Sequence, residues 1–251
     1  FTGVNTLFVG LMHTPGFASQ DFSKLRVCMG GGAPVQNAVS ARWKSITGQH
    51  ITEGYGLSET SPILTANPLS LTEAIGSIGI PFPSTDISIR DDDGKEVAMG
   101  EAGELCAKGP QVMRGYWQND TANAECFTPD GYFKTGDIAT VDAEGYFRIV
   151  DRKKDMILVS GFNVFPNEIE DVIAHLDGVM ESACVGVPDD KTGEAVKVFV
   201  VLSKDSVTED DIIAHCRKEL AAYKVPRQIV FKAELPKSTV GKILRRELRD
   251  A

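Results

Sequence analysis

Acidic, basic and glycine residues between Tyr132 and Asn163 are spaced in a way that suits chemistry on a nucleotide. Asp137 follows Gly136, and glycine allows the backbone to turn sharply there. A carboxylate only accepts hydrogen bonds, so two neighbouring ribose hydroxyls can donate to Asp137. The guanidinium of Arg152 is a planar set of donors suited to ribose or phosphate oxygens. Taken singly, each residue fits a solvated turn at about even odds, but the cluster as a whole favours a site.

Two glycine-containing loops are further candidates for contact with phosphate. The run Gly30-Gly31-Gly32-Ala33 separates a strand-like segment from a helical one, so backbone can approach a ligand near a helix N-terminus. This run lacks the GxGxxG pattern of a dinucleotide fingerprint. Gly241-Lys242 looks like the end of a Walker phosphate loop. Ile243 occupies the place where that loop needs Ser or Thr for magnesium, so the Walker interpretation fails.

The elements that must position these residues change character along the chain. Residues 1–75 alternate helical and strand-like spacing, which predicts an α/β arrangement. We expect a strand over residues 25–29 and a helix over residues 35–46 with Pro34 in its first turn. The chain opens inside an apolar run, as we would expect of a cut through a larger fold.

Two more segments follow. Residues 76–153 show two-residue alternation, so we expect a small, mostly antiparallel, barrel-like subdomain in which Trp117 is core or scaffold. Residues 154–251 predict a compact α+β domain, with one helix opened by Pro166 and another capped by Thr208 and ending near Pro226. Polar residues around Lys154 lie between two apolar runs, which suits a domain boundary.

Composition excludes several classes of protein. The chain has 251 residues, and its net charge of −9 argues against a broad nucleic-acid surface. The 5 cysteines form no CxxC pair and the 4 histidines have no metal-ligand spacing. These patterns indicate a reducing, cytoplasmic setting without a disulfide or zinc framework. No apolar run is long enough to span a bilayer.

The stretch 132–163 and the motif Ile51-Thr-Glu-Gly-Tyr-Gly-Leu-Ser-Glu-Thr60 resemble signature motifs of the adenylate-forming, or AMP-binding, enzymes. This family includes acyl-CoA synthetases, luciferases and adenylation domains of peptide synthetases. The resemblance runs along the whole chain and is closest to bacterial long-chain fatty acid–CoA ligases. It implies the C-terminal part of such an enzyme: the end of the large α/β subdomain, the barrel-like subdomain and a mobile C-terminal domain joined by a hinge.

The resemblance also implies roles for particular residues. Tyr55 would stack on adenine, as suits a flat apolar ring face, and Ser58 would lie near phosphate and the substrate carboxylate. Glu59 would ligate Mg²⁺, which usually takes only one or two protein carboxylates. Asp137 and Arg152 would hold the ribose and phosphate. The remaining positions implied to contact the nucleotide are Gly31, Gly32, Ala33, Glu53, Gly54 and Gly56.

The chemistry implied by the resemblance has two steps, with ATP, Mg²⁺ and coenzyme A as required partners. A fatty-acid carboxylate attacks the α-phosphate of ATP, and the thiol of coenzyme A then displaces AMP. Lys242 would hold the carboxylate and α-phosphate together on a mobile loop. Lys154 matches the family's hinge position. Rotation there would withdraw Lys242 and bring in Gly161, whose missing side chain leaves room for the pantetheine arm.

One departure from the family pattern matters. The family's Ser/Thr/Gly-rich phosphate loop, with its own lysine, appears nowhere in this sequence, so we expect this chain alone not to complete the ligase reaction. Two alternatives stay open: a peptide-synthetase-type adenylation domain and a nucleotide-binding remnant without turnover. Lys154 favours the ligase, because those adenylation domains usually carry aspartate there. Acyl chain length and oligomeric state cannot be read from the sequence. Peripheral contact with the inner face of the membrane is compatible with a lipid substrate, although no amphipathic anchor stands out.

Overall fold

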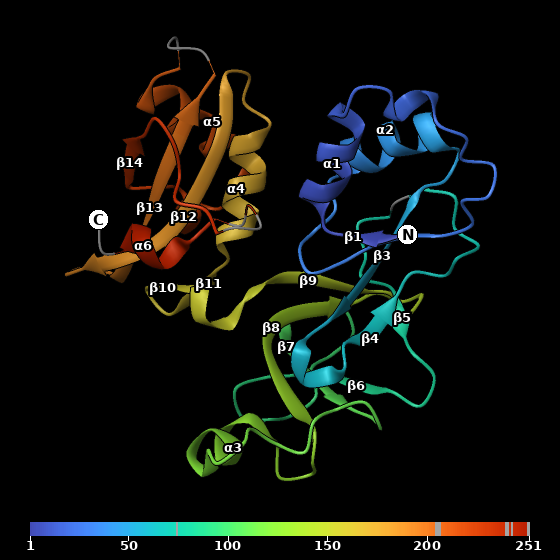
Figure 1. Cartoon of the computed structure of the whole chain (residues 1–251). Helices are drawn as coiled ribbons and strands as arrows, with labels where there is room; N and C mark the ends of the chain where they lie inside the picture. Colours follow the sequence, from blue (N-terminus) through green and yellow to red (C-terminus); the bar gives the residue numbers. More distant parts are fainter. Residues whose placement is uncertain (74, 204–206, 239–240, 242, 250–251) are drawn as a thin grey trace. The chain divides into compact units, whose positions relative to one another are not determined.

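The computed structural model describes residues 1–73, 75–203, 207–238, 241 and 243–249. The chain forms two compact units, Phe1–Ile149 and Val150–Ala251. Helices, a mixed sheet and an antiparallel sheet make up the first unit, and a second mixed sheet with helices makes up the other (Figure 1). The predicted mixture of α/β and α+β structure is thus observed at the level of fold class. The division into three segments and the hinge stay predictions.

The first sheet of the N-terminal unit has five strands in the order β1 to β5. Strands β1 to β3 are parallel, and β4 and β5 continue the sheet in antiparallel fashion. In Figure 1, α1 and α2 lie together beside the β1–β3 part of the sheet. The buried side chains between them are those of Phe8, Met12, Cys28, Val35, Val39, Trp43 and Ile51. The elements are β1 (Thr2–Gly3), α1 (Asn5–His13), β2 (Cys28–Gly30), α2 (Asn37–Thr47), β3 (Ile51–Gly56), β4 (Ile63–Ala66) and β5 (Ile80–Pro81).

Two predicted boundaries in this region were wrong. Strand β2 begins at Cys28, because its pairing with β3 begins there, opposite Ile51, the first residue of β3. Helix α2 begins at Asn37, so Pro34 lies in the preceding loop and not in the first turn. Side chains satisfy the N–H groups of this loop: Val35 donates to a carboxylate oxygen of Glu53 at 3.1 Å. The loop therefore stays extended instead of joining the helix.

The second sheet that begins in the N-terminal unit contains four strands in the order β6-β7-β8-β9, with antiparallel pairing of β6 to β7 and of β7 to β8; its last strand, β9, continues past Ile149 into the C-terminal unit. The predicted antiparallel sheet is present, and closure into a barrel stays a prediction. Trp117, predicted to be core or scaffold, precedes α3 (Asp120–Cys126) and is 88% exposed, so a place in the core is wrong. The strands are β6 (Asp86–Arg90), β7 (Gly103–Lys108), β8 (Phe133–Val141) and β9 (Phe147–Arg152).

The C-terminal unit is built around β13, which pairs with β12, β14 and, at one position, β10. Val198 and Val200 belong to one buried cluster and Phe199 and Val201 to another, as strand alternation requires when a sheet is covered on both faces. Helices α4 and α5 supply the first cluster, and Leu248 of α6 joins the second. The elements are β10 (Ile157–Val159), β11 (Phe162–Val164), α4 (Pro166–Ala174), β12 (Val179–Asp189), β13 (Gly193–Leu202), α5 (Glu209–Glu219), β14 (Gln228–Phe231) and α6 (Arg245–Arg249).

The helices of this unit follow their sequence signals at the start and depart from them at the end. Pro166 begins α4, and Thr208 caps α5 by accepting the Asp211 N–H at 3.2 Å. Helix α5 ends at Glu219, earlier than the predicted stop near Pro226, and a short 3₁₀ turn at 222–224 fills the interval. Among the described residues, no helix combines the length and apolar character needed to cross a membrane.

Candidate functional site

The carboxyl ends of parallel strands β2 and β3 bring together the first predicted site residues. Gly31 and Gly32 directly follow β2, and Gly30 pairs with Glu53 of β3. A Cβ on Gly31 would lie 3.2 Å from the Gly54 carbonyl oxygen, so the two backbones are in close contact. Gly32 has φ +76°, which favours glycine. Ligands of α/β sheets bind at the carboxyl ends of strands, and this is the position predicted for the adenine loop of Gly31, Gly32 and Ala33.

The glycines of β3 also have a packing reason. A Cβ on Gly56 would lie 1.8 Å from the carbonyl oxygen of Pro62, and one on Gly54 would lie 3.3 Å from that of Thr65. Strand β4 therefore lies too close to β3 for any side chain at Gly56. Gly54 and Gly56, which are predicted to face a nucleotide, are thus also required for the pairing of β3 with β4.

Glu53 holds the glycine loop in place. Its carboxylate accepts the Val35 N–H, and its own carbonyl accepts the Asn67 N–H at 2.9 Å. Burial raises the pKa of Glu53 above its ordinary value, while the hydrogen bond from Val35 opposes this. Within the described structure, the contacts of Glu53 join the loop after β2 to the end of β3. Direct contact with nucleotide stays a prediction for this residue.

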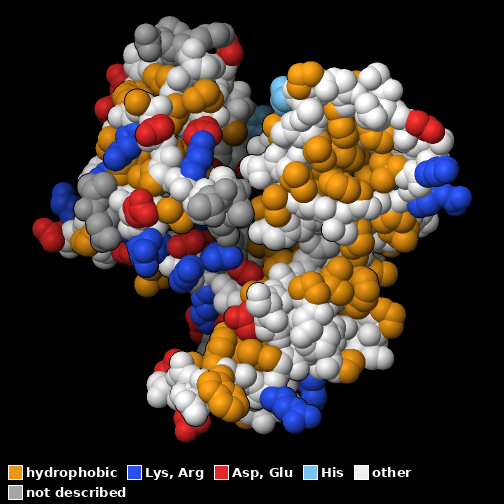
Figure 2. All heavy atoms as spheres, viewed as in Figure 1, with side chains coloured by type: hydrophobic (Ala, Val, Ile, Leu, Met, Phe, Trp, Pro, Cys, Tyr) orange, Lys and Arg blue, Asp and Glu red, His pale blue; other side chains and the backbone are white. Residues whose placement is uncertain are grey.

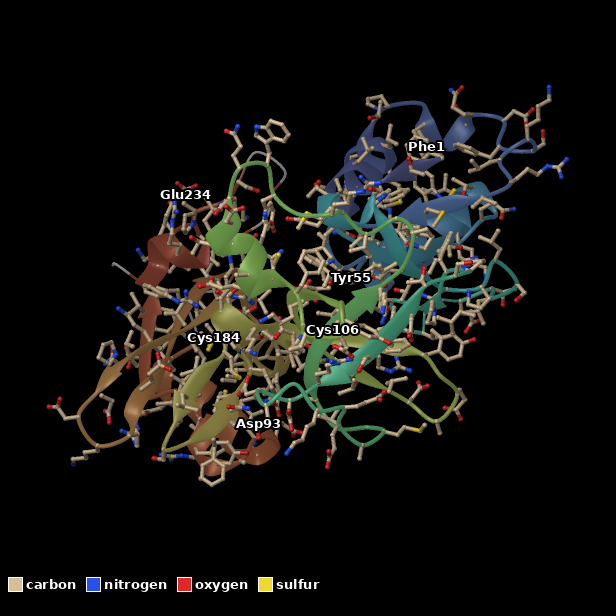
Figure 3. All side chains as sticks on the ribbon, turned by 90° about the horizontal axis from the view of Figure 1, so that it is seen from below. Phe1, Tyr55, Asp93, Cys106, Cys184 and Glu234 are labelled. Atoms are coloured by element: carbon tan, nitrogen blue, oxygen red, sulfur yellow. The ribbon has the colours of Figure 1, made fainter. Side chains whose placement is uncertain are left out.

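Tyr55 and Asp137, 82 positions apart in sequence, meet through their side chains. The Tyr55 hydroxyl donates to Asp137 Oδ2 at 2.5 Å, and Asp137 is 7% exposed on β8. Gly136, with φ +73°, lies inside β8 at a β-bulge opposite Leu105, instead of at a corner between strands. The bulge directs Asp137 towards β3. Figure 3 labels Tyr55 in the N-terminal unit, between teal β3 and the green strands of the second sheet.

Ser58 and Glu59 lie in a short 3₁₀ turn, 58–60, directly after β3. The Glu59 carbonyl accepts the Met113 N–H at 2.7 Å, and Glu59 Oε1 accepts the Tyr116 hydroxyl at 2.9 Å. Both Met113 and Tyr116 belong to the loop before α3. Ser58 is exposed. The turn therefore leaves Ser58 exposed, and the loop before α3 holds Glu59 by its backbone and by its side chain.

Tyr116 is a site residue that sequence reasoning missed. Asn123 fixes its backbone from both sides, accepting the Tyr116 N–H at 2.6 Å and donating to the Tyr116 carbonyl at 3.0 Å. Burial raises the pKa of Tyr116, and the hydrogen bond to Glu59 raises it further. The phenol therefore stays protonated and donates to the carboxylate. The text Gly115-Tyr116-Trp117 resembles family text, but nothing in its spacing indicates a partner at position 59.

Glu59 fits a magnesium ion of the kind that binds with nucleotide phosphates. Its carboxylate supplies hard oxygen ligands, and Mg²⁺ in such sites keeps several waters and uses one or two carboxylates. In the part of the chain that the structure describes, no three His, Cys, Asp or Glu residues group to hold a metal. Glu59 as a ligand of a magnesium ion shared with phosphate stays a prediction.

Three predicted residues, Arg152, Lys154 and Gly161, lie in the C-terminal unit. Arg152 ends β9, and its N–H donates to Asp151 Oδ1 at 2.7 Å. Lys154 is exposed in the 3₁₀ turn 153–155. Ser160 (φ 52°) and Gly161 (φ 83°) form the two-residue turn of the β10–β11 hairpin, the geometry that favours glycine. The approach of these residues to Asp137 stays a prediction.

Lys242, the predicted clamp lysine, lies outside the described residues, whereas its neighbours Gly241 and Ile243 are described.

An added Cβ at Gly161 would meet no heavy atom within 4 Å. The surface over the hairpin turn is therefore open within this unit, as the predicted passage for a narrow pantetheine arm requires.

Comparison with known proteins matches both ends of the chain. Residues 1–117 match the family described as AMP-binding enzyme, and residues 168–242 match the AMP-binding enzyme C-terminal domain. A long-chain-fatty-acid–CoA ligase of Yersinia pestis is 58% identical over 249 residues, which is 99% of this chain and 44% of that protein. One of Bacillus subtilis is 43% identical over 250 residues. The chain thus spans less than half the length of these curated relatives.

Solved structures agree with these matches. ATP-bound MatB from Rhodopseudomonas palustris superposes with a TM-score of 0.89 at 34% identity, over 99% of this chain and 50% of that one. The anthranilate CoA ligase AuaEII in complex with anthranoyl-AMP gives 0.81 at 33% identity, over 100% and 49%. Three observations point to the same family: the family matches, the similarity to ligases along the whole chain, and the contact of Tyr55 with Asp137. The chain belongs to the AMP-binding enzyme family.

Proposed function

We propose that the protein containing this chain is an ATP-dependent ligase that activates a fatty-acid carboxylate and transfers the acyl group to coenzyme A. The observation that carries this proposal is the contact of Tyr55 with Asp137 at the end of β3, in a chain 58% identical to a named long-chain-fatty-acid–CoA ligase. The contact joins the residue proposed for adenine to the residue proposed for ribose. One nucleoside could therefore be held by both.

The first step is the transfer of AMP to the fatty acid. A carboxylate oxygen attacks the α-phosphorus of ATP, and the bond to pyrophosphate breaks. Ser58 is exposed, and we assign it a place beside the phosphates. Glu59 would hold Mg²⁺, which neutralises phosphate charge when bound. Lys242 would contact the carboxylate and α-phosphate as charge shifts between them. Glycines 31, 32, 54 and 56 let the backbone approach the base.

The second step forms the thioester. The sulfur of coenzyme A attacks the acyl carbon, and AMP leaves. We assign Gly161 to the passage of the pantetheine arm and Arg152 to ribose or phosphate. The division into residues 1–75, 76–153 and 154–251, with a hinge at Lys154, belongs to the same proposal. Lys154→Pro, which fixes φ at the joint, should slow thioester formation more than adenylation; an equal effect on both steps would contradict a hinge.

The fatty acid, ATP and coenzyme A are the partners of this activity, and nucleic acid is not among them. A cytoplasmic location with peripheral contact at the inner face of the membrane would suit a water-insoluble acyl substrate. Lipid co-sedimentation of the full-length protein, with and without fatty acid, tests the membrane contact; failure to sediment in both conditions would contradict it.

The activity is tested on the full-length protein through its two half-reactions. Pyrophosphate exchange with a long-chain fatty acid measures adenylation, and release of AMP from preformed acyl adenylate plus coenzyme A measures transfer. Lys242→Ala should lower adenylation by roughly 10²–10³-fold, as for one lost transition-state donor, and should largely spare transfer. Exchange that depends on an amino acid and not on a fatty acid would instead favour a peptide-synthetase-type adenylation domain. Absence of exchange with either would favour a nucleotide-binding remnant.

A further inference from the structure

A largely buried ionic cluster lies in the C-terminal unit, and none of its members has a role in the proposed activity. We call Asp151, Asp155, Glu170 and Arg245 the Arg245 cluster. Arg245 Nη2 and Nε donate to the two carboxylate oxygens of Glu170 at 2.7 and 3.2 Å, a two-pronged contact. Arg245 Nη1 lies 3.6 Å from Asp155 Oδ2 and 3.9 Å from Asp151 Oδ1. The side chains of Asp151 and Arg245 are 0% and 17% exposed.

The cluster fixes the segment 151–155, which contains the proposed hinge. Asp151 accepts the N–H groups of Arg152 and Asn167 at 2.7 and 2.8 Å, one on each oxygen. Arg249, one turn beyond Arg245 on α6, donates to Asp155 Oδ1 at 2.8 Å and to the Lys154 carbonyl at 3.1 Å. Two arginines of one short helix therefore hold the segment 151–155 against the start of α4.

The same helix closes the loop that carries Lys242. Arg245 follows Lys242 by three positions. Lys237 and Ile243 form an isolated antiparallel bridge, and the Leu244 N–H donates to the Pro236 carbonyl at 2.8 Å. The Lys237 ammonium also pairs with Glu181 of β12. The two ends of the loop are thus fixed to each other and to the sheet, immediately before Arg245 enters the cluster.

Stability alone is a weak reason for this arrangement. Burial raises the pKa values of Asp151 and Glu170, and the nearby charge of Arg245 opposes the rise in both. Replacing a buried ion pair by well-packed apolar residues is often neutral or stabilising, and a buried pair can serve to specify position. Elsewhere on the face of this unit seen in Figure 2, acidic and basic side chains lie interspersed at the surface. The Arg245 cluster differs because its charges are largely buried.

We propose that Arg245 is a positioning residue for Lys242: its guanidinium locks the base of the Lys242 loop to Asp155 and Glu170, so that the loop base and the residues just after the proposed hinge move as one body. This role assumes the proposed ligase activity. Because a misplacement of about 1 Å can cost roughly 10²-fold in rate, loosening the lock should act mainly on the step that uses Lys242.

The test compares Arg245→Lys with Arg227→Lys in the full-length protein. The first change keeps the charge and loses the two-pronged contact; the second alters an exposed arginine of the same unit, which pairs with Asp189 at 3.0 Å. We expect Arg245→Lys to lower adenylation by roughly 10- to 10²-fold and to change transfer from preformed acyl adenylate by less than about threefold. Arg227→Lys should leave both half-reactions unchanged.

A double substitution separates positioning from support of the fold. In a Lys242→Ala background, Arg245→Lys should cause no further loss of adenylation, because residues that act as a unit are non-additive. Asp155→Asn, which removes the charge facing both arginines without changing size, should reproduce the selective loss. Additive losses of adenylation in the double variant would overturn the proposal. Equal loss of both half-reactions in Arg245→Lys and Asp155→Asn would also overturn it, whether or not these variants fold.

Failure of the ligase assignment would look different. A wild-type protein without fatty-acid-dependent exchange would refute the proposed function before any variant is compared. A wild-type ligase whose adenylation does not respond to Lys242→Ala would refute the clamp, and the positioning role of Arg245 with it. A normal response to Lys242→Ala combined with full activity of Arg245→Lys and Asp155→Asn would refute the positioning role alone.

Discussion

At the scale of single residues, the proposed nucleotide site is organised by contacts between carboxylates and hydroxyls. Asp137 accepts from Tyr55, and Glu59 accepts from Tyr116. Each phenol fixes a carboxylate whose assigned role requires a defined direction. A carboxylate has about four lone-pair positions, so one phenol contact does not by itself exhaust its capacity to accept.

Tyr116→Phe should weaken the binding of Mg²⁺ without affecting the fold. The change removes the hydroxyl that orients Glu59 and keeps the ring, and loss of an outer partner typically costs 10- to 100-fold in metal affinity or activity. We expect the Mg²⁺ concentration for half-maximal pyrophosphate exchange by the full-length protein to rise roughly tenfold. Tyr132→Phe is the matched control, because its hydroxyl donates to Asp86 at the edge of the other sheet. A similar shift in both variants would contradict a specific role for Tyr116.

Glu53→Gln should stabilise the chain at neutral pH. Burial raises the pKa of Glu53 in the folded chain above its unfolded value. Its contribution to stability is therefore fully present below the ordinary glutamate pKa and is lost as pH rises through the raised value. Glutamine stays neutral and can still accept from Val35. The urea midpoint of the variant relative to the wild type should thus rise as the pH rises above the ordinary glutamate pKa of about 4.

Asp211→Asn provides a control of opposite sign for that experiment. Hydrogen bonds from the Thr208 hydroxyl and N–H lower the pKa of Asp211. Its stabilising contribution is present above the unfolded pKa and is lost as pH falls. The Asn variant should therefore lose stability relative to the wild type as pH rises. Parallel trends for the two variants would show that the effect at Glu53 does not come from its burial.

The sequence singles out candidate site residues more readily than the partners that hold them. Tyr55, Glu59 and Asp137 stand out by motif, because their types and flanking glycines are local signals. Tyr116 and Arg245 do not, because their partners lie 57 and 75 positions away in the chain. Such pairings depend on which loop folds against which strand, and no local period or spacing carries that information.

At the scale of elements, β3 and β4 show how a binding edge constrains its neighbours. Gly56→Ala should destabilise the 251-residue chain by roughly 3 kcal/mol or more, because the new Cβ would lie 1.8 Å from the Pro62 carbonyl oxygen and backbone must shift. Gly10→Ala is the control: it lies inside α1 with nothing within 4 Å of an added Cβ. That change should stabilise by about 0.5–1 kcal/mol. Urea unfolding of both variants measures the difference, and a mild effect at Gly56 would mean that β4 can move away from β3.

Helices and strands could be predicted from the local sequence where an apolar face or a capping residue gives a clear signal. Helix α4 begins at the predicted Pro166, and α5 begins directly after its predicted cap, Thr208. The errors arise where a distant partner decides the boundary. Strand β2 begins only where β3 is available to pair with it, and α2 begins late because Glu53 holds the loop before it. Trp117 looked like core by residue type alone, yet its loop leaves it exposed.

At the scale of the whole molecule, each of the two units has its own buried core. The C-terminal unit has one cluster on each face of its sheet, and strand β13 contributes to both. A domain with its own core can in principle fold alone. Independent folding is what a turning C-terminal domain would require, because such a motion leaves the internal contacts of the domain unchanged.

The segment Val150–Ala251 should therefore fold when it is produced by itself. We expect a single cooperative urea transition and slow hydrogen exchange in β12 and β13, the most extensively paired strands of this unit. Arg245→Met in this segment provides an internal comparison, because it leaves Glu170 and Asp151 buried without their arginine and should lower stability by roughly 3–5 kcal/mol. A segment that is unfolded, or that exchanges all of its amides rapidly, would show that the core of this unit depends on residues before Val150. In that case the C-terminal unit could not turn as an independent body, and the motion proposed for Lys154 would have to be abandoned.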